Sequence, residues 1–379
     1  MVDYLRYYFN TLLVLTAIFG FYLGGQWVWL GASTYLVLLA LDLLLPNDYK
    51  NRKINHPLLV DFSLYLHVVL MLVMYGMFAW RMKQGFPPAT SYNLALLGSF
   101  ASLVWISAVP NLPIAHELMH RRSAVERFLA NIAATFFFDP HRAIGHVHTH
   151  HLYFDTEKDS DTPLRGEKFY EFIWRATKGA YLDTFELEKR RMAAKNKSVW
   201  GPSSIVFWGI VAVFGTPLAI GLYAGWLAGV ITLSVMVTTK FLLEALNYLQ
   251  HYGLQRDTNQ PIEDRHTWHH FSTMSRIAGL EITNHIDHHR DGFLPFYKLK
   301  VHKDAPEMPS VFICAPAAFI PWVWDNLIVK PRLKKWDLEY ASPEERKLAR
   351  KANLRAGWPD WIGESQSVTV QHHRASVWD

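Results

Sequence analysis

The sequence contains a single cysteine among its 379 residues. One cysteine excludes an intrachain disulfide, a four-cysteine iron–sulfur cluster and the paired cysteines of a rubredoxin-like centre. That residue, Cys314, lies in the apolar run 311–315, where we expect a buried, unreactive thiol rather than a haem ligand. The sequence also lacks a glycine-rich nucleotide-binding fingerprint of the G-x-G-x-x-G type. Any redox chemistry at this chain therefore needs electrons from a separate carrier.

Charged residues are scarce in the first third of the chain. Residues 1–115 contain six Lys/Arg and four Asp/Glu, whereas about one residue in four is charged in an average soluble domain. The whole chain is 50% hydrophobic and 19% charged. This composition excludes a simple soluble enzyme and a disordered protein. The net charge of +5 does not call for a nucleic-acid partner, because basic residues beside membrane spans account for it, and we expect no such partner.

Six apolar stretches approach the length of about 20 residues that a membrane-spanning helix needs. The first two are separated by Gly24 and Gly25, which predicts a tight turn and a helical hairpin. The predicted spans are Tyr7–Leu23, Trp27–Leu45, Leu58–Trp80, Tyr92–Ala115, Ser203–Tyr223 and Gly225–Leu246.

Basic residues predict the orientation of these helices. Loops on the cytoplasmic side are enriched in Lys and Arg, and the segments 46–57 and 119–201 are rich in both. We therefore predict a protein of the cytoplasmic membrane with both termini in the cytoplasm. The loop that contains Arg81 and Lys83 is a mild exception. Because the number of predicted spans is even, residues 116–202 and 245–379 are expected on the same, cytoplasmic, face.

The predicted fold is an all-α integral membrane protein of about six transmembrane helices with a cytoplasmic, histidine-rich helical catalytic region. An amphipathic helix is expected around Tyr181–Asn196, and the apolar stretch Val311–Val329, interrupted by two prolines, is expected to be interfacial or re-entrant rather than a seventh span. The predicted regions are 1–115 with four transmembrane helices, 116–202 as a cytoplasmic insert, 203–246 with two further helices, and 247–379 as a cytoplasmic tail.

Histidine is the residue in excess. The chain has 19 histidines, and 14 of them lie between His116 and His289. Residues three or four apart share one face of a helix, and neutral imidazole is the commonest metal ligand in proteins. The spacing therefore predicts that His116 with His120, His146 with His150, and His285 with His288 and His289 each aim at a common point. The four clusters span residues 116–120, 146–151, 247–253 and 284–289.

Nine histidines in these clusters are candidate ligands and catalytic residues. Nine ligands are too many for one tetrahedral ion and suit two metal ions. His148 is excluded because it would point off the face that its neighbours share, and the isolated His141, His302, His372 and His373 are expected at the surface or in packing. His266, His269 and His270 are expected to be structural, with a ligand role left open. The candidates are His116, His120, His146, His150, His151, His251, His285, His288 and His289.

Two readings from other classes compete with a two-metal centre. Residues 116–120 also read H-E-x-x-H, the helix of zinc metalloproteases with Glu117 as the general base. That reading leaves at least six clustered histidines without a role. A metal transporter would need ionisable groups inside the spans, where only Asp42, Lys240 and Glu244 are expected.

The clusters and the motifs around them resemble the membrane di-iron hydroxylases, the superfamily of alkane monooxygenases, xylene monooxygenases and fatty-acid desaturases. The likeness covers nearly the whole chain and is closest to the hydroxylase components of xylene monooxygenase, with the p-cymene methyl hydroxylases also similar. The segments that carry it are 24–32, 116–122, 149–153, 159–163, 247–254, 281–286 and 356–359.

The resemblance implies two non-haem irons held by the same nine histidines. It implies that O2 is used to hydroxylate a methyl group of an alkylbenzene such as toluene, xylene or p-cymene. The electrons would come from NADH through a separate reductase carrying flavin and an iron–sulfur cluster. An alkane 1-monooxygenase or a desaturase is the alternative within the superfamily.

The resemblance also suggests supporting roles for other residues. Four carboxylates are candidates for orienting imidazole N–H groups: Glu117, Asp159, Asp161 and Glu281. An apolar substrate would enter from the lipid bilayer through a channel, for which Trp27, Trp29 and Trp105 are candidate lining residues. Basic residues at 189–191 or 330–335 are candidate docking points for an acidic reductase, or contacts with the membrane surface.

Overall fold

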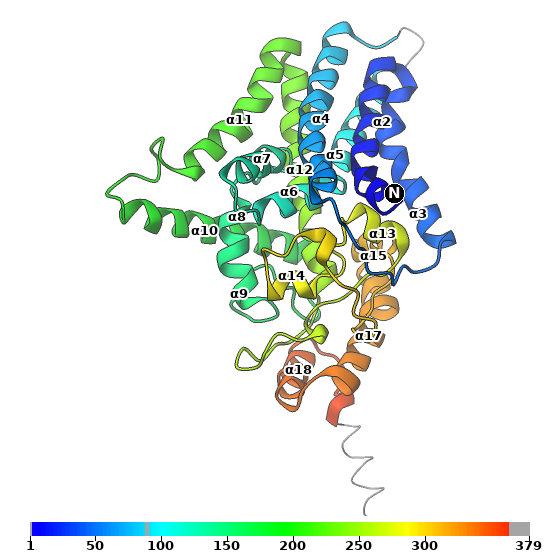
Figure 1. Cartoon of the computed structure of the whole chain (residues 1–379), viewed down its shortest axis with the longest axis vertical. Helices are drawn as coiled ribbons and strands as arrows, with labels where there is room; N and C mark the ends of the chain where they lie inside the picture. The colour runs from blue at the N-terminus through cyan, green and yellow to red at the C-terminus, as the bar shows by residue number, and fades with distance from the viewer. Residues whose placement is uncertain (1, 88–90, 364–379) are drawn as a thin grey trace, which may run out of the picture.

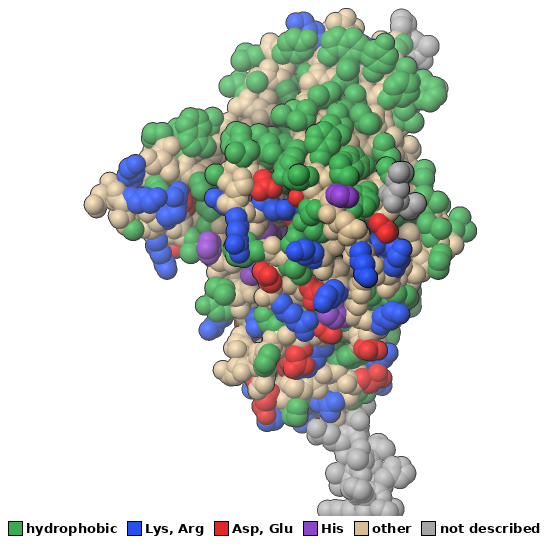
Figure 2. Space-filling model, in the orientation of Figure 1, with side chains coloured by type: hydrophobic (Ala, Val, Ile, Leu, Met, Phe, Trp, Pro, Cys, Tyr) green, Lys and Arg blue, Asp and Glu red, His purple; other side chains and the backbone are tan. Residues whose placement is uncertain are grey.

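Long helices make up one half of the molecule, and mainly shorter helices and loops make up the other (Figure 1). The computed structural model describes residues 2–87 and 91–363. Within these stretches the structure is helical without any β-strand, and extended segments pair only at the isolated bridges Asn47–Ser272 and His269–Glu307. Figure 2 shows hydrophobic side chains over the upper half and charged side chains gathered over the lower half. The predicted all-α class is confirmed.

Five helical stretches in the described part of the chain are long and apolar enough to cross a membrane. Each overlaps one of the six predicted spans, so the chain is a multi-pass membrane protein. The stretches are Gly25–Leu44, Pro57–Gln84, Tyr92–Met119, Ile205–Ala224 and Trp226–His251. They comprise η2 (Gly25–Trp29) with α3 (Leu30–Leu44), α4 (Pro57–Gln84), α5 (Tyr92–Ala108) with α6 (Asn111–Met119), α11 (Ile205–Ala224) and α12 (Trp226–His251).

The first predicted span is shorter than expected. A 3-10 turn, η1 (Arg6–Tyr8), separates the short α1 (Val2–Leu5) from α2 (Phe9–Leu23). At 1.5 Å per residue, the 15 residues of α2 extend only about 22 Å, less than the roughly 30 Å of a bilayer core. Figure 1 shows α2 beside α3 and α4 in the apolar half. With α2, that half contains about six helices, as the sequence predicts.

The expected hairpin between the first two apolar stretches is present. Gly24 and Gly25 have positive φ angles of 71° and 60°, which glycine adopts without steric cost. The Arg81 guanidinium of α4 donates hydrogen bonds to the carbonyl oxygens of Phe21 and Tyr22 at the end of α2. Arg81 therefore caps α2. It lies in the last turn of α4 rather than in the loop where the sequence placed it, and this contact explains why a basic residue stands there.

The polar half is built from short helices and loops. The expected helix at Tyr181–Asn196 is part of a longer one, α10 (Phe169–Ala193). The remaining elements are α7 (Ala124–Thr135), α8 (Arg142–Gly145), η3 (His146–His150), α9 (His151–Tyr153), η4 (Asp264–His266), α13 (Thr273–Ala278), α14 (Ile286–Arg290), η5 (Phe296–Lys298), α17 (Lys330–Lys335), η7 (Trp336–Tyr340) and α18 (Pro343–Arg355).

The apolar stretch 311–329 does not form a spanning helix. It is divided into α15 (Val311–Ala318), α16 (Pro321–Val323) and the π-helical η6 (Trp324–Val329), and eight residues of α15 extend only about 12 Å. Cys314 is buried in α15, and burial raises the pKa of its thiol to about 12. The expected unreactive thiol is therefore what the structure contains.

The ionisable residues expected inside the spans are all paired. Lys240 bonds Asp139 and Glu244 at 2.7 Å each, and Arg142 lies 3.3 Å from Glu244. Asp42 accepts hydrogen bonds from the backbone of Met274 and the Ser275 hydroxyl. The charges of Lys240 and Glu244 are therefore compensated by partners inside the protein, and the Asp42 carboxylate is satisfied by neutral hydrogen-bond donors.

Candidate metal centre

The structure brings all nine candidate histidines together in two adjacent groups. Within each group, one side-chain nitrogen from every histidine lies within 4.8 Å of the others. The histidines come from α6, from the segment η3–α9, from the end of α12 and from α14 with its preceding residue. The first group is His116, His120, His146, His151 and His288, and the second is His150, His251, His285 and His289.

The histidines of the second cluster divide differently from the prediction. His146 and His150 were expected to share one point, but His146 belongs to the first group and His150 to the second. The cause is the π-helical turn η3, in which the His151 N–H bonds the carbonyl of His146 five residues back. In a π-helix residues five apart share a face, so His146 pairs with His151 and His150 turns to the other group.

The helix α14 connects the two groups. His285 and His289 are four residues apart and belong to the second group, with ring centroids 4.4 Å apart. His288 belongs to the first group, and its ring lies 4.5 Å from that of His116. The short helix α14 and the residue before it thus contribute candidate ligands to both groups, which keeps the groups adjacent.

The nine rings have the properties of metal ligands. Each has at least one buried ring nitrogen without a hydrogen-bond partner among the described residues, and such orphaned atoms are costly unless something binds them. Burial and neighbouring histidines lower the pKa of His146, His288 and His289 well below the usual value. These rings are therefore neutral at pH 7, the form that binds a metal. A set of neutral imidazoles fits iron, zinc or copper.

Two aspartates hold histidines of the second group. Asp159 Oδ2 lies 2.8 Å from Nδ1 of His150, and Asp155 Oδ1 lies 2.9 Å from Nδ1 of His251. Each contact leaves Nε2 free for a metal and fixes the ring orientation.

Burial by itself lowers the pKa of His150, but the charge of Asp159 outweighs burial and raises that pKa. Sequence reasoning found Asp159 but missed Asp155, whose signal was its position four residues after His151.

The other three carboxylates with an expected orienting role contact arginines instead. Glu117 lies 2.8 Å from the Arg121 guanidinium. In a similar way, Asp161 lies 3.3 Å from Arg142, and Glu281 lies 2.9 Å from Arg6. Among the described residues none of the three makes a hydrogen bond to a clustered histidine. The predicted contact with a histidine ring is wrong for these three residues, because each carboxylate forms an ion pair with an arginine instead.

The remaining histidines lie outside both groups. His148 is exposed. His266 contacts Glu345, His269 contacts the Asp264 carbonyl, and His270 contacts the Pro309 carbonyl. These three residues therefore make contacts within the fold and belong to neither histidine group. His302 lies between Asp264 and Asp287, and His141 packs beside Tyr181, while His372 and His373 lie outside the described residues.

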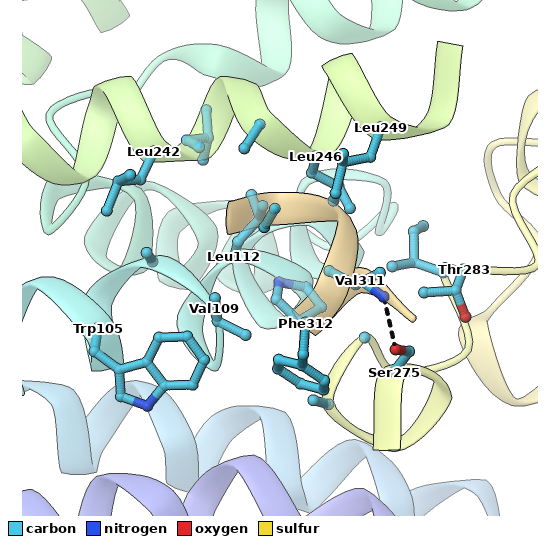
Figure 3. Close-up of a pocket in the computed structure, with 18 of the residues that line it drawn as sticks. Trp105, Val109, Leu112, Leu242, Leu246, Leu249, Ser275, Thr283, Val311 and Phe312 are labelled. Carbon is cyan, nitrogen blue, oxygen red and sulfur yellow. Dashed lines mark hydrogen bonds between the residues drawn. The ribbon is translucent and has the colours of Figure 1, made fainter. Parts of the chain in front are cut away.

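An apolar cavity of about 170 Å³ lies between α5, α6, α12, α13 and α15. Figure 3 shows Leu242, Leu246 and Leu249 of α12 on one side and Trp105 and Phe312 on the other. Two lining residues stand close in the chain to candidate ligands. Leu112 precedes His116 by one helical turn, and Thr283 precedes His285 by two residues. The cavity therefore extends from the apolar half toward the histidine groups.

Only one of the three candidate channel tryptophans lines this cavity. Trp105 is part of its wall. Trp29 packs instead against Gly98, where an added Cβ would meet the indole nitrogen at 2.5 Å, and Trp27 is 49% exposed. Trp27 and Trp29 both belong to the hairpin turn. The Trp27 ring faces the outside of the helix bundle, and the Trp29 ring packs between helices.

The fold and the site together define a multi-pass helical membrane protein whose histidines are arranged for a pair of metal ions. Comparison with known proteins identifies the family. Residues 90–310 match the model of a family described as fatty acid desaturase. The chain belongs to this membrane di-iron family, whose members include monooxygenases.

Several relatives are named monooxygenases. The chain is 44% identical to the xylene/toluene monooxygenase hydroxylase component XylM of Pseudomonas putida, over 95% of this chain and 97% of that protein. It is 30% identical to the alkane 1-monooxygenase of Acinetobacter baylyi over 57% of this chain and 54% of that protein. It is 26% identical to alkane 1-monooxygenase 1 of Pseudomonas aeruginosa over 69% of each chain. The protein is thus a monooxygenase of this family.

Proposed function

We propose that this protein hydroxylates a methyl group of an alkylbenzene at a di-iron centre held by the nine clustered histidines. The observation that carries the proposal is the pairing of two buried imidazole groups with an apolar cavity that extends toward them. The methyl group gains one oxygen atom of O2, the second becomes water, and NADH supplies the two electrons through a separate reductase. One relative is named a hydroxylase component, and this name supports the presence of a separate electron-supplying partner.

The residues of this chain have separate tasks in that reaction. The nine histidines would hold the irons, which when bound supply the O2 activation and the radical chemistry needed to break a methyl C–H bond. Asp155 and Asp159 fix the rings of His251 and His150. The cavity walls orient the substrate, and the apolar lining excludes water from the reacting carbon.

The size of the cavity favours a small aromatic ring. An engineered protein cavity of about 150 Å³ lined by Leu, Ile and Phe binds benzene, and this cavity of about 170 Å³ is lined almost wholly by apolar atoms. Trp105 and Phe312 contribute aromatic faces to its wall, which stack or pack edge-on with a substrate ring. These features support toluene, xylene or p-cymene over a long alkane.

We further propose that the protein lies in the cytoplasmic membrane with its termini and histidine groups on the cytoplasmic side. Basic loop residues support this orientation. The substrate partitions into the lipid and reaches the cavity from the apolar half, whereas the reductase approaches from the cytoplasm. Reporter fusions at the C-terminus and within the loop 85–91 test it, because the two sites are expected on opposite faces.

A product assay tests the function. The purified, iron-loaded protein is supplied with NADH, reductase and O2, together with toluene, p-xylene, p-cymene or octane in parallel reactions. We expect benzylic alcohols from the aromatic substrates and little octanol. Octanol as the main product would reassign the protein to alkane hydroxylation, and alkenes alone would refute hydroxylation. Zinc instead of iron in the active protein would refute the di-iron proposal.

A further inference from the structure

The wall between the first histidine group and the solvent is thin at one place. A Cβ added to Gly292 would lie 3.1 Å from Nδ1 of His120 and 3.4 Å from Cε1 of His151. Gly292 therefore leaves room for no more than a methyl group between its backbone and two candidate ligands. On the other side of this backbone the chain meets the solvent, since the neighbouring Asp291 is exposed and Phe293 is 59% exposed.

A groove with basic residues lies beside this thin wall. Its lining includes Lys53 from the loop before α4, Arg290 at the end of α14, and Lys298 and Lys300. Among residues 2–87 and 91–363, the three lysines form no ion pair within 4.0 Å. They therefore present free positive charge. We call these four residues the basic groove.

Basic residues outnumber acidic residues in the lining of this groove, where Arg52, Lys53, Arg290, Lys298 and Lys300 lie with Asp287 and Asp291. Asp287 contacts Arg290 and both the backbone N–H of Lys300 and the ring of His302. Asp291 accepts a hydrogen bond from the Phe293 N–H. The groove consequently has a positive surface potential, which attracts a partner with an acidic face.

Phe293 adds an apolar contact next to the charges. Its ring is exposed, and the guanidinium of Arg122 lies 5.0 Å from the ring centre. Exposed aromatic residues and arginines are the residue types that most often dominate binding energy in protein interfaces. Thin wall, positive groove and exposed ring thus occur together on one surface of the polar half.

We propose that the basic groove, Gly292 and Phe293 form the docking surface for an acidic electron-transfer protein that reduces the metal centre. This inference rests on the proposed function, because only a redox enzyme needs such a partner. Electron transfer slows steeply with distance, and a partner at this surface is separated from His120 and His151 by one backbone segment. Lipid headgroups would satisfy the positive charge, but they would not explain a thin wall over the histidines.

Charge reversal in the basic groove tests the proposal. The full-length, iron-loaded protein is placed in phosphatidylcholine nanodiscs, where no anionic lipid is present, and hydroxylation is measured against reductase concentration. For Lys298→Glu with Lys300→Glu we expect the KM for reductase to rise roughly tenfold at low salt, since charges at an interface mainly control the association rate. The kcat is expected to stay within about twofold of the unmodified protein.

The basic residues 189–191 of α10, a docking point that the sequence suggests, provide the competing surface for comparison. Lys189→Glu with Arg190→Glu reverses two exposed basic residues that belong to a different part of the polar half. We expect this variant to leave the KM for reductase within about twofold. An unchanged KM in the groove variant, or a raised KM in the α10 variant alone, would overturn the proposed docking surface.

A second measurement separates this proposal from the proposed function. All variants are reduced chemically with dithionite and exposed to O2 and substrate for a single turnover, which bypasses the reductase. Equal product yield in all three proteins, together with a raised KM in the groove variant, supports docking at the groove. Absence of product from the unmodified protein as well would instead refute the hydroxylase function.

Discussion

His148 and His150 lie two residues apart but have opposite environments. His148 is exposed, whereas His150 is buried, bonds Asp159 and belongs to the second histidine group. We predict that His148→Ala keeps its iron. For His150→Ala we predict that the iron content falls by roughly half or more, because three ligands remain where four stood. Metal analysis of the purified proteins checks this, and equal iron loss in both would contradict the ligand assignment.

The contact between Asp155 and His251 fixes a ring that no other side chain bonds within residues 2–87 and 91–363. Removing such a carboxylate typically weakens metal binding 10- to 100-fold, so we predict that Asp155→Asn lowers the affinity for iron by that factor. Asp257→Asn is the control, because the Asp257 carboxylate bonds Asn259 in its own turn and no histidine in the described part of the chain. Titration of the metal-free proteins with Fe(II) measures both affinities. Equal affinity of the two variants would show that Asp155 has no such role.

At the scale of elements, the π-helical turn η3 decides which histidines face each other. It places His146 and His151 in the first group and His150 in the second. Deleting His148 would shorten the turn by one residue, so that His146 and His150 become three residues apart and turn to the same helix face, which takes His150 away from the second group. We predict that this deletion abolishes iron binding, whereas His148→Ala at the same position preserves it. Retention of iron in the deletion variant would show that the π-turn is dispensable.

The helix α18 is fastened to the polar half through Glu345. Burial by itself raises the pKa of this carboxyl, but hydrogen bonds from His266, Arg265 and the Ser342 N–H outweigh burial and lower the pKa from 4.5 to about 2. The ionised carboxylate therefore stabilises the fold fully above about pH 4.5, and this contribution is lost as the pH falls toward 2.

Replacement of Glu345 tests that anchor. We predict that Glu345→Gln lowers the thermal unfolding midpoint by a few degrees at pH 7, because a charged hydrogen-bond acceptor is worth about 1.5–3 kcal/mol. The difference from the unmodified protein is expected to shrink as the pH is lowered from 4.5 toward 3. Unfolding curves in detergent at several pH values measure it, and a difference that grows toward acid pH would contradict the sign.

At the scale of the whole molecule, the cavity is formed by helices from both ends of the chain. Phe312 of α15 lies beside Trp105 and faces α12 across the cavity, so its side chain limits the length of the substrate. We predict that Phe312→Val shifts the kcat/KM ratio of p-cymene over toluene upward by roughly tenfold, since a few methylene groups are worth this much in an apolar pocket. Phe214→Val, at a ring 54% exposed on α11, is expected to leave the ratio unchanged.

Much of this architecture follows from the sequence. Apolar length alone marks the membrane-spanning helices, because a helix in lipid must satisfy its own backbone hydrogen bonds over the full bilayer. The division of the chain at 115, 202 and 246 stays a prediction. The helix α2 shows the limit of predicting spans from hydropathy. The apolar run begins in residues that form the 3-10 turn η1 rather than the α-helix, and hydropathy does not distinguish the two backbones.

The nine histidines are predictable from the sequence because imidazole is rarely clustered for any reason other than metal binding. Their distribution between two groups is not, because it depends on the backbone between them. Spacing rules assume 3.6 residues per turn, and the π-turn at 146–150 breaks that assumption. Asp155 is paired with His251 across 96 residues, and only the packing of the 151–156 segment against the end of α12 brings the two together.

The sequence by itself therefore determined the class, the membrane setting and the identity of the candidate ligands, since each depends on composition and short-range spacing. Only the tertiary structure decided which carboxylates hold the rings, which tryptophan lines the cavity, and where the histidines come closest to the solvent. These features depend on contacts between segments far apart in the chain, and such contacts are set by packing rather than by local pattern.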